Sequence, residues 1–143
     1  MTVARILAEK GREVATTEPH RTLNEVVTLL AARGIGAVVV ADASQAVLGI
    51  LSERDVVRVI AQSGAAALDD PVSRHMTAKV TTVTSSDTID HVMATMTEGR
   101  FRHLPVVEGG RLMGIISIGD VVKRHVSQLD SERQALREYI ATA

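Results

Sequence analysis

Apolar residues recur at intervals of three and four in two separate stretches of the chain, 23–30 and 89–96. This spacing puts the apolar side chains on one face of a helix, so two half-buried helices are predicted. Thr22 and Thr88 stand just before these stretches, and a hydroxyl at that position is typical of an N-cap. Glu25 follows Thr22 by three residues, as in a capping box.

Shorter apolar runs, broken by Asp-Ala-Ser-Gln at 42–45 and Glu-Gly-Gly at 108–110, predict two β-hairpins. A second helix is expected after each hairpin, near Asp55 and Asp120, because a carboxylate suits the positive end of a helix. The predicted strands are 14–17, 36–41 and 47–52 in the first half and 80–83, 103–107 and 112–117 in the second.

The two halves are copies of one another. Thr16, Thr22 and Val40 correspond to residues 66 positions later, and the segment 49–58 corresponds to 114–123 at an offset of 65. One residue is therefore missing from the second hairpin turn, where a deletion is tolerated. Gly34 and Gly99 stand where each first helix is expected to end in a left-handed residue. The chain is thus predicted to be a tandem repeat.

The amino-acid composition limits the classes of function that the chain can have. The chain has 143 residues, a formal charge of −1 and no cysteine, which suits one domain without disulfides or a thiol nucleophile. The balanced charge offers no general attraction to nucleic acid or to an anionic membrane. Phe101 and Tyr139 are the only aromatic residues, so a flat ligand must rely mainly on aliphatic side chains and backbone groups. No targeting segment is recognised, and a cytoplasmic location is expected.

The strongest motif is Gly, two apolar residues, Ser, two variable residues and Asp. It occurs twice, at 49–55 and at 114–120. With the matching helices and hairpins, and with Met76-Thr77 before the second copy, the chain from Val3 to Val126 resembles a tandem pair of CBS domains. The resemblance implies an α+β fold of two β-α-β-β-α repeats related by pseudo-two-fold symmetry. The expected divisions are 1–61 for the first repeat with its N-terminal segment, 62–76 for a linker, 77–126 for the second repeat and 127–143 for a C-terminal helix.

The same resemblance implies a regulatory module that binds an adenine nucleotide in two clefts between the repeats. AMP is the first expectation, and ADP, ATP and NAD(H) are the others. The motif's Asp is expected to bind the ribose hydroxyls, to which a carboxylate offers two acceptors, and its Ser the ribose or phosphate. The first-strand Thr and backbone groups of the second strand are expected to hold the base. One cleft would combine Thr82, Arg102, His103 and Leu104 with Ser52, Arg54 and Asp55, and the other Thr16, Gly36, Ala37 and Val38 with Ser117, Gly119 and Asp120.

The two expected clefts differ in charge. The first contains Arg54, Arg102 and His103, with Lys79 or Arg58 able to approach, whereas the second has small or apolar residues at the matching positions. We therefore expect the first cleft to bind phosphorylated ligands more tightly. The alternative is that the two aspartates have only a structural role as helix caps and that the arginines only face solvent.

Two other functions stay open at this stage. A ligand-free interaction module would keep the same fold, and a His-based metal site would need His75 and His103 to meet in space. Catalysis is not expected, because the chain has no P-loop and no His-Glu-x-x-His motif. A homodimer and an unidentified effector protein are the expected partners. The C-terminal stretch carries Leu129, Leu136, Tyr139 and Ile140 on one side, which fits packing either on its own domain or on another chain.

Overall fold

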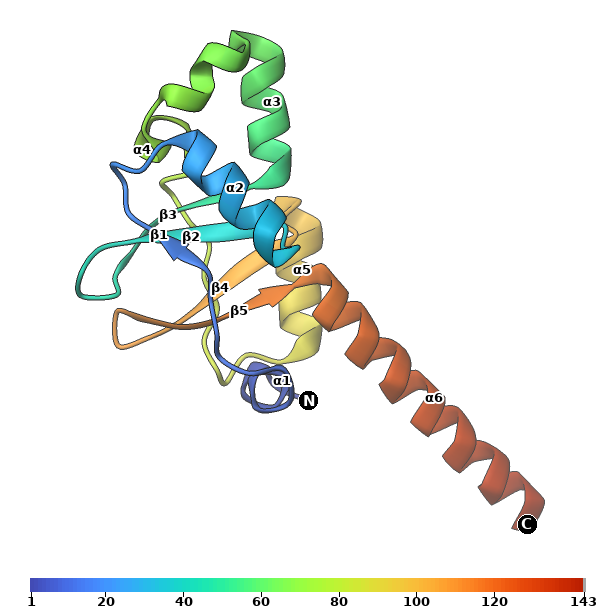
Figure 1. Ribbon diagram of the computed structural model, residues 1–143. Coiled ribbons are helices and arrows are strands. Elements are labelled where there is room, and N and C mark those ends of the chain that lie inside the picture. Colours follow the sequence, from blue (N-terminus) through green and yellow to red (C-terminus); the bar gives the residue numbers. More distant parts are fainter. Residues whose placement is uncertain (143) are drawn as a thin grey trace.

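The structure is a computed structural model that describes residues 1–142. It has a mixed α+β fold of two repeats with a long C-terminal helix, as the sequence predicted (Figure 1). In chain order the elements are α1 (Val3–Lys10), β1 (Thr16–Thr17), α2 (Leu23–Arg33), β2 (Ala37–Ala41), β3 (Val47–Ser52), α3 (Glu53–Ser63), the 3-10 helix η1 (Ala65–Asp69), α4 (Val72–His75), α5 (Ile89–Gly99), β4 (His103–Glu108), β5 (Arg111–Ser117) and α6 (Ile118–Thr142).

The first repeat is built on a three-stranded sheet in the order β1-β2-β3. Strand β1 runs parallel to β2, and β2 pairs antiparallel with β3 through the predicted hairpin. All five residues of β2 are buried, which explains why this strand reads as an unbroken apolar run. Helix α2 packs Leu23, Val26 and Leu30 into the same core as Val38.

The helix ends follow the predictions, with one exception. Thr22 and Thr88 cap α2 and α5, because each hydroxyl accepts a hydrogen bond from the amide three residues later, at 3.2 and 3.1 Å. Gly34 ends α2 in the left-handed region. The same role for Gly99 was wrong: Arg100 adopts that conformation, with φ of 57°. Gly99 is the last residue of α5, and the ring of Phe101 occupies the space that a side chain there would need.

The second repeat has a core that sequence reasoning did not foresee, because α1 belongs to it. The hairpin β4-β5 and helix α5 form as predicted, whereas the expected first strand is reduced to a single parallel bridge between Val83 and Val106. Val3, Ile6 and Leu7 of α1 are buried against this repeat. A side chain on Gly114 would lie 2.7 Å from the Leu7 Cδ2 atom, so the motif's glycine lets α1 lie against β5.

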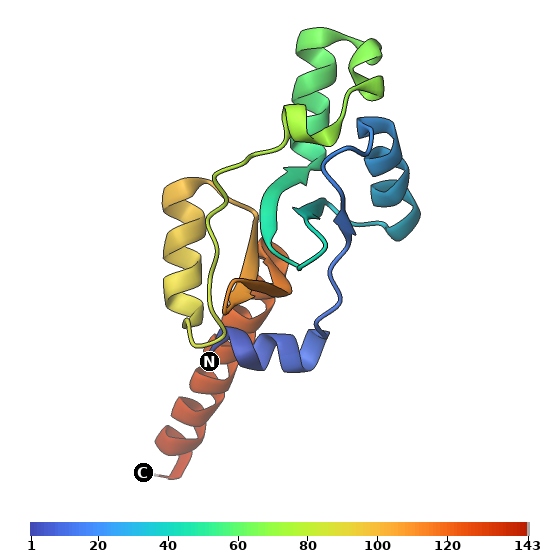
Figure 2. The same ribbon diagram turned by 90° about the vertical axis from the view of Figure 1, so that its left-hand side faces the viewer.

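The linker folds back onto the first repeat before it reaches the second (Figure 2). The Val72 amide donates to the Arg21 carbonyl at 2.7 Å, and the Leu23 amide donates to the Asp70 carbonyl at 3.0 Å. Thr77 then pairs with Ile50 of β3 through two backbone hydrogen bonds of 2.9 and 3.0 Å. The linker therefore ends at the edge of the first repeat's sheet.

Helix α6 runs without a break from the second repeat into solvent, and it is the orange-to-red helix that projects from the body in Figure 1. The predicted boundary at residue 127 falls inside this helix, and residue 143 lies outside the described residues. Every described residue from 126 onward is exposed. None of the helices in residues 1–142 combines the length and the apolar character that a membrane span requires.

Candidate functional site

A cleft of about 390 Å³ lies where the two repeats meet. Its walls come from the start of α3 in the first repeat, from the segment before β4 in the second, and from the chain that links them. The start of α6 closes one side. The lining residues are Gly36, Ile50, Ser52–Asp55, Arg58, Thr77, Lys79–Thr81, Arg100–His103 and Ser117–Gly119.

A capping box holds Asp55 in the first turn of α3. Its Oδ2 atom accepts hydrogen bonds from the Ser52 amide at 2.8 Å and from the Ser52 hydroxyl at 3.0 Å. The other oxygen, Oδ1, has a single long contact of 3.4 Å from Arg58, a side chain that is 64% exposed. One oxygen of Asp55 therefore serves the fold, and the other remains able to accept hydrogen bonds from a ligand.

The cleft carries more positive than negative charge. Five of its residues are Arg or Lys, and two are acidic, Glu53 and Asp55. Within residues 1–142, no ion pair involves Arg54, Arg100 or Arg102. These guanidinium groups are exposed at the cleft wall, so they can bind an anion without first breaking an internal bond.

His103 lines the cleft from the second repeat and lies close to Gly36 of the first. Its ring Cε1 atom is 3.3 Å from the position that a Cβ on Gly36 would occupy, so the glycine gives this ring its space. Burial lowers the pKa of His103 below its ordinary value, although the nearby Glu53 opposes this. The ring is therefore neutral at pH 7, and it presents one donor and one acceptor nitrogen.

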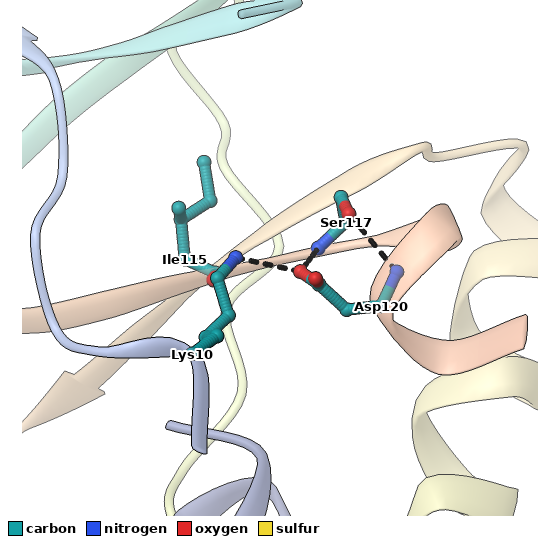
Figure 3. A network of polar contacts seen from close by, with 4 residues as sticks. All are labelled: Lys10, Ile115, Ser117 and Asp120. Carbon is teal, nitrogen blue, oxygen red and sulfur yellow. Dashed lines mark hydrogen bonds and ion pairs between the residues drawn. The ribbon is translucent and has the colours of Figure 1, made fainter. Parts of the chain in front are cut away.

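Asp120 corresponds to Asp55 in the repeat, yet its surroundings differ (Figure 3). Lys10 reaches across from α1, and its Nζ lies 2.6 Å from Asp120 Oδ2 and 2.9 Å from the Ile115 carbonyl. The same Oδ2 accepts from the Ser117 amide at 2.9 Å. Burial alone would raise the pKa of Asp120, but the hydrogen bonds from Lys10 and Ser117 hold it below its ordinary value. Asp120 is thus an ionised carboxylate that already has a cation beside it.

The structure brings together part of each expected residue set. Nine of the fifteen predicted residues line the one cleft: Gly36, Ser52, Arg54, Asp55, Lys79, Arg102, His103, Ser117 and Gly119. The other six lie elsewhere. Leu104, Ala37 and Val38 are buried in the cores, and Thr82 is exposed outside this cleft. Thr16 lines a different hollow with Asp42 and Gln45, and Asp120 faces Lys10.

Several cleft residues were absent from the predicted set. Thr77 and Ile50 are placed there by their mutual backbone pairing, a contact between distant segments that no local pattern reveals. Arg100 and Phe101 lie directly beside the predicted Arg102, so continuing the run by two residues would have found them. Phe101 also places one aromatic ring in the wall of the cleft.

A metal centre finds no support among the described residues. Residues 1–142 contain no group of three or more His, Asp or Glu side chains arranged to hold an ion. His75, one of the two histidines considered for such a site, contacts Asp70 at 2.8 Å.

Known proteins share both the sequence and the fold. The sequence profile of the CBS domain matches residues 5–62 and 72–127. The mitochondrial CBS domain-containing protein CBSX3 of Arabidopsis thaliana is 33% identical over 149 residues, an alignment that covers 97% of this chain and 71% of that protein. The crystal structure of a CBS-domain-containing protein from Agrobacterium tumefaciens is 50% identical, with a TM-score of 0.84 and coverage of 87% of this chain and 99% of that chain.

A further solved structure bears on the cleft. The CBS domain protein of Pyrobaculum aerophilum, whose structure is complexed with AMP, is 28% identical with a TM-score of 0.75, covering 84% of this chain and 89% of that chain. Each matched segment of the family profile contains the hairpin of one structural repeat and the helix that precedes it. This chain therefore belongs to the CBS-domain proteins and carries two CBS domains in tandem.

Proposed function

We propose that this protein is a regulatory module that binds an adenosine-containing nucleotide, AMP in the first place, in the cleft between its two CBS domains. ADP, ATP and NAD(H) are the other candidates. Asp55 is the residue on which this function depends, because its Oδ1 atom is engaged only by the exposed Arg58. A ribose presents two neighbouring hydroxyl donors, and this carboxylate oxygen accepts such donors at the floor of a cleft wide enough for a nucleoside.

The charge of the cleft supports a phosphorylated ligand. Arg54 and Arg102 approach from different repeats, so a phosphate between them would join the two halves. Helices α3 and α6 both begin at this cleft, and helix N-termini attract anions through their free amides and dipole. The AMP complex of the Pyrobaculum protein shows that a related CBS pair takes a ligand of this chemistry.

One cleft per chain is the expected stoichiometry. In the second half of the protein, the carboxylate equivalent to Asp55 is neutralised by Lys10. A ribose there would have to displace a partly buried ammonium that also bonds to the Ile115 carbonyl, whereas at Oδ1 of Asp55 it would displace only the exposed Arg58. The two halves of the duplication therefore serve different purposes.

The output is regulation rather than catalysis. Among the described residues, His103 is the one imidazole that lines the cleft, and the hydroxyl of Ser52 bonds to Asp55 rather than to this ring. The nucleotide would bridge the repeats and change their packing, which requires two arrangements that bind it differently. The signal then passes to an effector protein. The module pairs as a homodimer, and exposed apolar residues at equivalent places in the repeats, Val57 and Val122, suit that association.

Isothermal titration calorimetry with AMP, ADP, ATP, NAD and adenosine tests this function. Asp55→Asn is compared with the matched variant Asp120→Asn. A hydrogen bond to a charged group contributes ~1.5–3 kcal/mol, so Asp55→Asn should lower the affinity for AMP by about 10- to 100-fold. Asp120→Asn should leave the affinity within about threefold, because that carboxylate lies outside the cleft.

Arg54→Ala separates ligand binding from folding, because this side chain takes no part in the capping box. It should lower the affinity for AMP more than the affinity for adenosine, because adenosine has no phosphate. Equal AMP affinity in the wild type and in Asp55→Asn would overturn the assignment of the site. If none of the five compounds raised the melting temperature of the protein, the ligand-free interaction module would be the correct reading.

A further inference from the structure

Most of α6 has no partner in its own chain. Beyond His125 the helix continues for 17 described residues, all of them exposed, which is about 25 Å of helix. Isolated helices of this length are marginal in water, and most helical stability in proteins comes from packing an apolar face. Figures 1 and 2 show the helix leaving the body of the molecule, with no other segment alongside its last turns.

Five exposed apolar residues of α6, from Val122 to Ile140, form a heptad pattern. With Arg133 at the remaining position of the series, they recur at spacings of four and three; the exposed Tyr139 flanks this series and Ile118 precedes it. This spacing continues over nearly three heptads and marks the seam of a coiled coil rather than the broader face of a helix that lies on a domain. The seam residues, with their exposed fractions, are Val122 51%, Val126 50%, Leu129 49%, Leu136 59% and Ile140 64%.

We propose that this seam binds the same seam of a second copy of the chain, as a parallel, in-register, two-stranded coiled coil. The flanking charges select this partner and this direction. In a parallel pair, Glu132 of one copy faces Arg137 of the other, and the reciprocal contact forms as well. Within residues 1–142, Arg137 makes no ion pair, so its charge is available for this contact.

The antiparallel arrangement is disfavoured by the same residues. Aligning the seams in opposite directions about their centre brings Asp130 against Asp130, Glu132 against Glu132, and Lys123 against Arg137. Each of these contacts is a like-charge pair. Arg133 sits at a core position of the parallel pair, where a single polar residue lowers stability but specifies register and the number of strands.

This inference concerns the exposed length of α6, most of which lies beyond the cleft, and it holds whether or not a nucleotide binds. It assigns the α6 part of the proposed homodimer interface, to which Val122 belongs. The chain has no cysteine, so an introduced cysteine can form a disulfide only with the same residue of another copy. Leu136→Cys places a thiol in the seam, where it meets its own copy only in a parallel, in-register pair. Ser131→Cys places one on the outer face of the same helix, as the matched control.

Under mild oxidation, most of the full-length Leu136→Cys protein should convert to a disulfide-linked dimer, and Ser131→Cys should stay mainly monomeric on a non-reducing gel. Equal cross-linking of both variants, or none in Leu136→Cys, would overturn the proposal. Sedimentation then quantifies the seam without a disulfide. Leu129→Ser with Leu136→Ser should weaken dimerisation by at least about tenfold, because two leucines per chain lose their burial.

The outcomes also separate the seam from the other proposals. Neither leucine lines the cleft, so AMP affinity should be unchanged in the double variant, and a loss of nucleotide binding alone would leave the seam intact. A dimer that persists unweakened in the double variant would show that the copies join through another face and that the seam proposal fails. A monomeric wild type at all concentrations would refute both the homodimer and the seam.

Discussion

Replacing Lys10 with methionine removes the ammonium that neutralises Asp120 and keeps the aliphatic stem. The ion pair is 2.6 Å long, and its two side chains are 26% and 23% exposed. A hydrogen bond to a charged group contributes ~1.5–3 kcal/mol, and partial exposure places this one toward the lower end. We therefore expect Lys10→Met to reduce the free energy of unfolding by about 1–2 kcal/mol at pH 7.

The cost should depend on pH in a defined direction. The pKa of Asp120 in the folded protein lies below its ordinary value, because the hydrogen bonds from Lys10 and Ser117 outweigh the effect of burial. The stabilisation is therefore complete above the unfolded value of about 3.9 and is lost as the pH falls through the folded pKa. Lys10→Met should thus cost less at low pH than at pH 7.

Urea denaturation of the wild type, both single variants and the Lys10→Met/Asp120→Asn double variant measures this contact as a coupling energy. Arg5→Met is the matched control, because Arg5 is on the same helix and is 70% exposed. It should change stability by less than about 0.5 kcal/mol. The reasoning is refuted if Lys10→Met costs as much in the Asp120→Asn background as in the wild type, or as much at low pH as at pH 7.

Three further predictions test other contacts. Arg100→Gly should raise the free energy of unfolding by about 0.5–1 kcal/mol, measured by thermal unfolding, because glycine relieves the left-handed backbone. The variant should also bind AMP more weakly, because a cleft guanidinium is lost; unchanged stability would contradict the first effect. His103 has a lowered pKa, so wild-type stability should fall relative to His103→Gln as the pH drops below about 6.5, and parallel pH profiles would refute this. Gly49→Ala should lower the free energy of unfolding by about 2–3 kcal/mol and Gly114→Ala by about 1 kcal/mol. A Cβ at residue 49 would lie 3.0 Å from a backbone oxygen, whereas one at residue 114 would meet the flexible end of a leucine side chain. Denaturant midpoints in the reverse order would contradict this prediction.

Local features of the fold were predictable because each has a local cause. The offset of 66 or 65 residues fixed two copies of the same elements, and the hairpins appear within one or two residues of their predicted bounds. Thr22 caps its helix because a hydroxyl before an apolar-periodic run has an amide to accept from. The reciprocal half of that capping box did not form, since Glu25 turns toward Arg21 at 3.6 Å.

The contacts that distinguish the two halves were beyond local reasoning. Lys10 and Asp120 are 110 residues apart, and no spacing rule connects them. The left-handed residue at Arg100 escaped prediction because glycine is the usual choice and Gly99 stood one position earlier. The uninterrupted course of α6 did have a signal: no glycine or proline occurs between Asp120 and Thr142, and such a stretch continues a helix rather than ending one.

The position of α6 joins the two proposals physically. Its first turn, at Ile118 and Gly119, lines the proposed nucleotide cleft, and the turns from Val122 onward carry the proposed seam. Two salt bridges from α1 hold the first two turns of this helix, one from Lys10 to Asp120 and one from Glu9 to Arg124, each 2.6 Å long. A rigid helix of 25 residues transmits a tilt at its start to its far end. Linkage then requires that if a nucleotide changes the dimer dissociation constant by some factor, dimerisation changes nucleotide affinity by the same factor. Measuring AMP affinity above and below the dimer dissociation constant determines that factor directly, and a factor of one would mean that α6 joins two copies without carrying the signal.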